Sequence, residues 1–246
     1  MLSRTLKMAF WVCYDHLGKL LVANILCVML LLFPLGGIYA VLLSGNPHWM
    51  VWVGVPLLAM TVGVVLPVES AALAYMVKEL IDTRDGSVAL FFTGLRRYAL
   101  RAAGLGVVYG LALSCLITSM WFYAARVGVS VPWLGYALSA LALWCLVFAL
   151  LAALFVMSAL VQKKAGVLAT LKISGLLVLD NPLFSVGLAV WALLGMALWL
   201  LPPVLMFFSI APLVVLLSSA YEMLSRKYAA IDAHRAVGDA TKALKI

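Results

Sequence analysis

Long uncharged stretches alternate along this chain with short segments that carry most of its Lys and Arg residues. A helix needs about 20 apolar residues to cross the hydrocarbon core of a bilayer, and Pro and Gly divide the uncharged stretches into six pieces of about that size. We therefore predict an all-α integral membrane protein with six transmembrane helices arranged as three hairpins. The predicted spans are Leu20 to Leu43, Trp49 to Val77, Ala102 to Ala125, Trp133 to Leu160, Leu183 to Leu201 and Val204 to Ala220.

Proline marks each predicted outer turn. Asn46 and Asn181 each stand directly before a proline, a pair that typically starts a helix, because Asn can cap free N–H groups and proline has no N–H to leave unpaired. The fifth and sixth spans have almost no loop between them, and Pro212 can kink or delay the last helix. The outer turns contain Asn46-Pro47, Pro132 and Pro202-Pro203.

The distribution of basic residues predicts the topology. Sixteen of the 17 Lys and Arg residues lie in four segments, and only Arg126 lies elsewhere. Short loops rich in Lys and Arg stay on the cytoplasmic side during insertion, so both termini and two loops are expected inside, with three short turns outside. The four groups are Arg4, Lys7 and Lys19; Lys78, Arg84, Arg96, Arg97 and Arg101; Lys163, Lys164 and Lys172; and Arg226, Lys227, Arg235, Lys242 and Lys245.

The composition excludes an ordinary water-soluble domain. Hydrophobic residues make up 67% of the 246 positions and charged residues 11%, against about 45–50% and 25% in soluble domains. The net charge of +8 is spread over segments that flank the predicted spans, so anionic lipid headgroups are the expected partners rather than nucleic acid. We treat residues 1–246 as one six-span domain.

A long internal period suggests repeated units. The first, third and fifth spans begin near Gly18, Leu100 and Pro182, at intervals of 82 residues. Residues 1–79, 80–162 and 163–246 are candidate repeats, each with an interfacial helix, an outward span, a proline turn and an inward span. Identity between the units is weak, so a triplication and the ordinary spacing of a six-span protein both stay open.

Three cytoplasmic segments are candidate interfacial helices, with basic residues beside Phe10-Trp11, beside Phe91-Phe92, and beside Leu168 and Leu171. In the second segment, Thr93, Arg97 and Arg101 recur every four residues, as expected for a helix that lies in the headgroup plane. We expect Arg96, Arg97 and Arg101 to contact lipid headgroups. Residues 221–246 are predicted to continue the last helix into the cytoplasm and to end near Gly238.

Glu69 is the single acidic residue within an apolar run. It lies about eight residues before the inner end of its helix, roughly 12 Å deep at 1.5 Å per residue. An ionisable side chain at such a depth is a candidate functional site. Two interpretations stay open: a structural carboxyl group that is protonated or hydrogen-bonded to Asn24 or Tyr109, and a proton- or cation-linked site.

Small residues recur every four positions on the third span, at Ala102, Gly106, Gly110 and Ser114. Such a stripe lets a second helix approach closely, and Gly106 to Gly110 is a GxxxG motif. Packing within the bundle is favoured over a homodimer, because a six-span chain has many internal helix contacts.

The sequence shows no motif that indicates an enzyme, a metal centre or a cofactor site. His16, His48 and His234 are far apart, and HExxH, GxxxxGK[ST], GxSxG and CxxC are all absent. Cys27, Cys115 and Cys145 lie in apolar runs and Cys13 on the cytoplasmic flank, so we expect buried free thiols rather than disulfides.

Three segments resemble the YesL-like family of uncharacterised bacterial membrane proteins. They are FWVCYDHLGKLLVANILCVMLLLFPLGG from Phe10 to Gly37, the stretch from Pro67 to Arg101, and LKISGLLVLDNPLFS from Leu171 to Ser185. Glu69 and a longer C-terminal tail depart from the family. The resemblance implies a bacterial inner-membrane protein, often associated with carbohydrate-uptake gene clusters, and supplies no activity and no catalytic residues.

These observations favour a non-enzymatic accessory or assembly factor that works through lipid and partner contacts. A homo-oligomer and a complex with a transporter are both compatible with this function. The alternative is a small transporter or channel that uses Glu69 and Asn24, although a transporter usually has several polar residues or broken helices at the membrane midplane.

Overall fold

The computed structural model describes residues 1–83, 86–164, 166–197 and 206–243, and these form helices joined by short connections, with no strand among them. Four helices are long and apolar enough to cross a membrane, and they contain the first four predicted spans. A fifth crossing is possible if two bent helices count as one span. The four are Leu17–Ser44, Pro47–Thr83, Ala89–Val127 and Pro132–Lys163.

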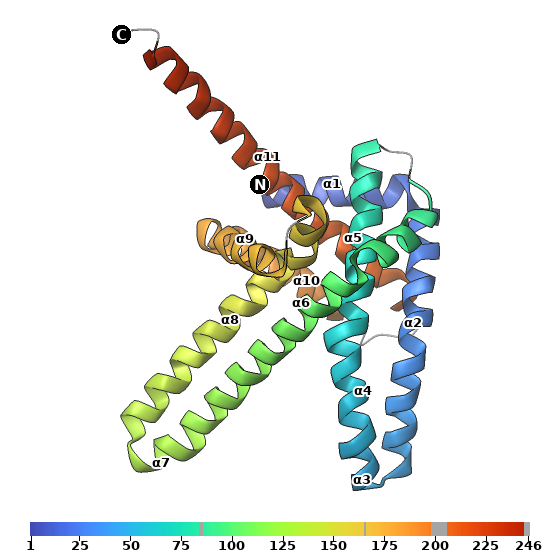
Figure 1. Cartoon of the computed structure of the whole chain (residues 1–246), viewed down its shortest axis with the longest axis vertical. Coiled ribbons are helices and arrows are strands. Elements are labelled where there is room, and N and C mark those ends of the chain that lie inside the picture. Colours follow the sequence, from blue (N-terminus) through green and yellow to red (C-terminus); the bar gives the residue numbers. More distant parts are fainter. Residues whose placement is uncertain (84–85, 165, 198–205, 244–246) are drawn as a thin grey trace.

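The first two long helices lie side by side (Figure 1). α2 (Leu17–Ser44) ends at Gly45, whose φ of +60° gives the left-handed conformation that closes many helices. Asn46 then accepts a hydrogen bond from the N–H of His48, so its predicted capping role is confirmed. The second helix runs without a break from Pro47 to Thr83. Its parts are α3 (Pro47–Trp49), the π-helical η1 (Met50–Gly54), α4 (Val55–Met60), the π-helical η2 (Thr61–Val65) and α5 (Leu66–Thr83).

The third and fourth long helices also lie side by side. α6 continues through a π-helical turn and a short helix to Pro132, which occupies the first turn of α8. Phe91 to Arg101 belongs to α6 itself, so the separate interfacial helix predicted there is wrong. No proline or glycine pair interrupts this segment, and the helix propagates through it. The bounds are α6 (Ala89–Phe122), η3 (Tyr123–Val127), α7 (Gly128–Ser130) and α8 (Pro132–Lys163).

The predicted fifth span begins with a sharp bend. α9 (Val167–Asp180) and α10 (Pro182–Ala197) meet at 105°, and within the described residues neither is long enough to cross a membrane alone. Residues 198–205, with the predicted turn at Pro202-Pro203, lie outside the described residues. Residues 206–220 of the predicted sixth span belong to α11 (Met206–Ala243), and residues 204–205 lie outside the described residues. α11 continues past Gly238, so the helix end predicted there is wrong.

α11 forms much of the core. It packs against α1 (Leu2–Asp15), α2, α5, α8 and α10, and most of its residues from Ile210 to Leu224 are buried. One end of the bundle, which we call the basic end, contains α1, the α5–α6 turn, the α8–α9 turn and the C-terminal part of α11 (Figure 1). From the basic end the α2–α5 pair and the α6–α8 pair diverge, with α3 and α7 at the far ends.

The divergence leaves the long helices largely exposed within the monomer. In their most apolar stretches, 28% of residues are buried in Leu17–Ser44, 17% in Ala89–Val127 and 22% in Pro132–Lys163, and only 6% in Pro47–Thr83. Cys115 and Cys145, predicted to be buried, are exposed on α6 and α8, whereas Cys27 is buried. Contact within the chain is therefore concentrated toward the basic end.

Candidate functional site

Glu69 lies in the first turn of α5 and is buried inside the bundle. Its side chain is 2% exposed, and neither carboxyl oxygen has a hydrogen-bond partner among the described residues. An ionised carboxylate in an apolar interior costs several kcal/mol unless a cation or water pairs with it. Glu69 therefore has two buried carboxyl oxygens without a hydrogen-bond partner among the described residues.

The helix is irregular just before Glu69. The π-helical turn η2 ends at Val65, and Pro67 has no N–H to donate to the carbonyl of Gly63, four residues earlier. This carbonyl faces α6 at Gly106, where an added Cβ would lie 2.2 Å from the Gly63 oxygen. π-helical turns are frequent at functional sites. A π-helical turn also changes the rotation of the residues that follow it, and the buried Glu69 lies four residues after the end of η2.

Asn24 does not pair with Glu69. Its side-chain oxygen accepts a hydrogen bond of 2.8 Å from the N–H of Ala211 in α11, one residue before Pro212. The predicted Asn24–Glu69 hydrogen bond is therefore wrong. Because Pro212 disturbs the backbone pairing of its helix, a side-chain acceptor from α2 stabilises α11 at the point where the ladder is weakest.

Tyr109 is also directed elsewhere. Its hydroxyl donates a hydrogen bond of 2.7 Å to the carbonyl of Ala149 in α8, so the predicted Tyr109–Glu69 contact is wrong. Tyr109 lines a pocket of about 170 Å³ between the second long helix, α6 and α8, together with Val62, Pro67 and Gly110. The three polar residues singled out from the sequence thus lie in three separate environments.

The small-residue stripe of α6 is used along half its length. Ala102 and Gly106 are buried, and Gly106 touches the backbone of Gly63 and the ring of Pro67. An added Cβ at Gly110 would meet nothing within 4 Å, and Ser114 is exposed. The stripe therefore packs within the bundle near the basic end and then continues, without a partner from the described chain, where the helix pairs diverge.

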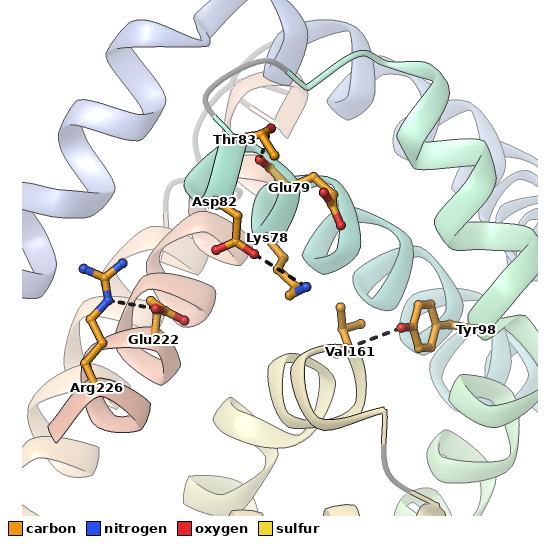
Figure 2. A network of polar contacts seen from close by, with 8 residues as sticks. All are labelled: Lys78, Glu79, Asp82, Thr83, Tyr98, Val161, Glu222 and Arg226. Carbon is orange, nitrogen blue, oxygen red and sulfur yellow. Dashed lines mark hydrogen bonds and ion pairs between the residues drawn. The ribbon is translucent and has the colours of Figure 1, made fainter. Parts of the chain in front are cut away.

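The three predicted headgroup residues, Arg96, Arg97 and Arg101, are all exposed on α6. Arg97 lies over the ring of Tyr98, with 5.8 Å between the guanidinium carbon and the ring centroid. Tyr98 is buried, and its hydroxyl donates to the carbonyl of Val161 at 3.4 Å (Figure 2). Arg96 and Arg97 also line a pocket of about 400 Å³ with Phe92 and Thr93.

A polar contact between the α9–α10 bend and α11 was not foreseen. The Asn181 amide donates to the Tyr228 hydroxyl at 2.7 Å, and its oxygen accepts from the Lys227 ammonium at 2.8 Å. The Tyr228 hydroxyl donates to Asp180 at 3.2 Å. Burial and the neighbouring Asp180 raise the pKa of Tyr228. The helix start at Asn181-Pro182 was predicted. The Asn181 side chain, however, bonds to Leu177, Tyr228 and Lys227 rather than capping the first N–H groups of α10.

The described residues contain no group of three or more His, Cys, Asp or Glu side chains that could hold a metal ion. Two ion pairs appear at helix surfaces, Lys78–Asp82 at 3.5 Å in α5 and Arg226–Glu222 at 2.8 Å in α11 (Figure 2). Exposed pairs of this kind contribute little to stability and mark no reaction centre.

Comparison with known proteins gave no relatives: no family model, no curated protein and no solved structure matches the chain.

Proposed function

We propose that this chain is a non-enzymatic multi-pass membrane protein that works as an accessory or assembly factor through contacts with other membrane helices. The observation that carries this proposal is the small buried fraction of the long helices, 6% in the most apolar stretch of Pro47–Thr83. Helices within a compact bundle bury much more of their surface, because each meets two or more neighbours. The surface between the diverging pairs is suited to a partner helix.

The same proposal includes the finer topology. Six spans in three hairpins, in the bacterial inner membrane with both termini in the cytoplasm, agree with the positive-inside distribution of Lys and Arg. This orientation is supported by the basic end, where α1, the turns after α5 and α8, and the C-terminal part of α11 lie together (Figure 1). The YesL-like resemblance adds the proposal that the assisted system takes up carbohydrate.

Site-specific photo-crosslinking in native membranes tests the partner contact. Leu58 and Ile117 are 53% and 51% exposed, and each lies four residues from a residue of the inter-helix pocket, Leu58 before Val62 and Ile117 after Leu113. A photoreactive residue at either position would lie between the pairs. Phe33 on α2 is 82% exposed and serves as the matched control. We expect discrete protein adducts from Leu58 and Ile117 and lipid adducts alone from Phe33. Lipid adducts alone from all three positions would remove the support for a partner.

A second candidate function, proton- or cation-linked transport, is favoured by one specific observation. Glu69 is buried with two oxygens that lack partners in the described chain. A carboxyl group held this way can exchange a proton or bind a cation when water reaches it, and intramembrane acids mark such pathways. Glu69 does not line the pockets of 560, 480, 400 and 170 Å³, which ranks this function second.

Proton flux into proteoliposomes that contain a pH-sensitive dye distinguishes the two functions. The transport function predicts flux above empty vesicles that is lost in Glu69→Gln and kept in Glu79→Gln, an acid-to-amide control ten residues further along the same helix. The accessory function predicts flux equal to empty vesicles for all three proteins. Equal flux by wild type and Glu69→Gln, above the empty vesicles, would exclude Glu69 as the proton carrier.

A further inference from the structure

A pocket at the basic end lies between the first turn of α1 and the C-terminal half of α11. Its volume is about 560 Å³, and it is lined by Met1, Arg4, Met223, Arg226 and Lys227. Three of these five side chains are cationic, and none is acidic. Three positive charges around one cavity repel one another, and a bound anion relieves that repulsion.

The basic side chains retain free hydrogen-bond donors. Arg226 uses its Nε to bind Glu222 at 2.8 Å, and its two terminal nitrogens point away from Glu222 (Figure 2). Lys227 donates one of its three ammonium N–H groups to the side-chain oxygen of Asn181 at 2.8 Å. Arg4 forms no ion pair with the residues that the structure describes. The pocket therefore offers guanidinium forks and an ammonium group to an oxyanion.

The pocket lies at the level where the bundle changes from apolar to charged. Most residues of α11 from Ile210 to Leu224 are buried, and its first basic residues, Arg226 and Lys227, follow just after this stretch. Met1 and Met223 give the pocket an apolar side. On the neighbouring α1, the exposed rings of Phe10, Trp11 and Tyr14 pack against one another at centroid distances of 5.9 to 6.3 Å. Such clusters are typical of the membrane–water interface.

We propose that this pocket binds a phosphate group, carried by an anionic phospholipid or by a soluble phosphate compound. Phosphate oxygens accept the paired N–H groups of Arg, and Lys adds a point charge. The apolar side and the interfacial depth suit a lipid. This site is separate from the exposed Arg96, Arg97 and Arg101, and it does not depend on the accessory function.

Native mass spectrometry of the purified full chain in detergent, titrated with phosphatidylglycerol, tests the site. The triple variant Arg4→Gln, Arg226→Gln, Lys227→Gln is compared with Lys163→Gln, Lys164→Gln, Lys172→Gln, which removes the same charge from another part of the basic end. We expect the first variant to lose at least about tenfold in affinity, since each basic group near the headgroups contributes to binding. We expect less than about a twofold change in the second, whose charges lie outside the pocket.

Glu222→Gln provides a variant that should gain affinity. It removes the negative charge beside Arg226 and releases Nε, so phosphatidylglycerol should bind more tightly. Equal losses in both triple variants, binding of phosphatidylcholine as tight as that of phosphatidylglycerol, or weaker binding by Glu222→Gln would each overturn the proposal. Displacement of the lipid by inorganic phosphate, at constant ionic strength, assigns the site to soluble phosphates, and resistance to displacement assigns it to lipid.

Discussion

Replacing Gly106 by alanine tests the closest approach between α5 and α6. A Cβ at this position would lie 2.2 Å from the carbonyl oxygen of Gly63 and 2.4 Å from the Pro67 ring. Neither neighbour can rotate away, because one is backbone and the other is a ring fixed to it. The two helices must separate by about 1 Å to restore ordinary van der Waals distances.

The expected cost follows from the extent of this contact. Inserting a methyl group into a well-packed interface destabilises a protein by about 1–3 kcal/mol, which lowers the Tm of a chain of this size by roughly 2–12 °C. Gly110→Ala is the matched control on the same stripe, since nothing lies within 4 Å of its added Cβ. Intrinsic tryptophan fluorescence during heating, in one detergent, gives both Tm values.

The comparison of the two variants decides whether the close approach exists. Alanine has a higher helix propensity than glycine, so Gly110→Ala should match or slightly exceed the wild-type Tm. Gly106→Ala gains the same propensity and should still fall below wild type. Equal Tm values for Gly106→Ala and Gly110→Ala would show that Gly106 does not touch the Gly63 carbonyl, and the placement of α5 against α6 would then be wrong.

Three further predictions concern other contacts. Asn24→Leu leaves the Ala211 N–H without its side-chain acceptor and should cost about 1–3 kcal/mol, measured as a lower Tm; an unchanged Tm would show that the bond is dispensable. Tyr228→Phe removes the hydroxyl that joins Asp180 to Asn181. As this contact is exposed, we expect the free energy of unfolding to fall by less than about 1 kcal/mol, but the amides of α9 to exchange faster. Unchanged amide exchange in α9 would contradict this prediction. Burial raises the pKa of Cys13 to about 11, so maleimide labelling of a variant with Cys13 as its sole cysteine should be slow at neutral pH and accelerate up to about pH 11, whereas a plateau near pH 9 would refute the burial.

Local signals in the sequence were sufficient to predict much of the fold. The first four spans and the helix starts at Pro47 and Pro182 were predicted, because apolar length and proline position act within a few residues of each other. The separate interfacial helix before the third span was wrong, because amphipathic spacing does not reveal whether a helix stops before it enters the bilayer. At Asn181-Pro182, in contrast, a proline directly follows the break between α9 and α10.

The candidate site was predictable in part. Charge in an apolar run was enough to select Glu69, and its burial follows from the rotation that η2 and Pro67 give to α5. The surroundings of Glu69 were not predictable, because the depth of a residue in its helix does not show whether the Asn24 or Tyr109 side chain points toward Glu69. Those two side chains instead satisfy backbone groups at Ala211 and Ala149. Buried polar groups pair with the nearest free backbone group, and that depends on helix rotation.

α11 explains why the basic end holds together while the far ends diverge. Near Pro212 it is hydrogen-bonded to Asn24 of α2, and four to five turns later it binds the α9–α10 bend through Tyr228. Between these points Arg226 lines the phosphate pocket with Arg4 of α1. A ligand that binds Arg4 and Arg226 together therefore stabilises the position of α11 in which both residues line the pocket. The gain in free energy equals the difference between the ligand's binding free energies for this position of α11 and for any other position. The α2–α5 and α6–α8 pairs begin to diverge beyond the part of the bundle that α11 reaches (Figure 1). α11 is therefore the element through which headgroup binding can act on the space between the pairs.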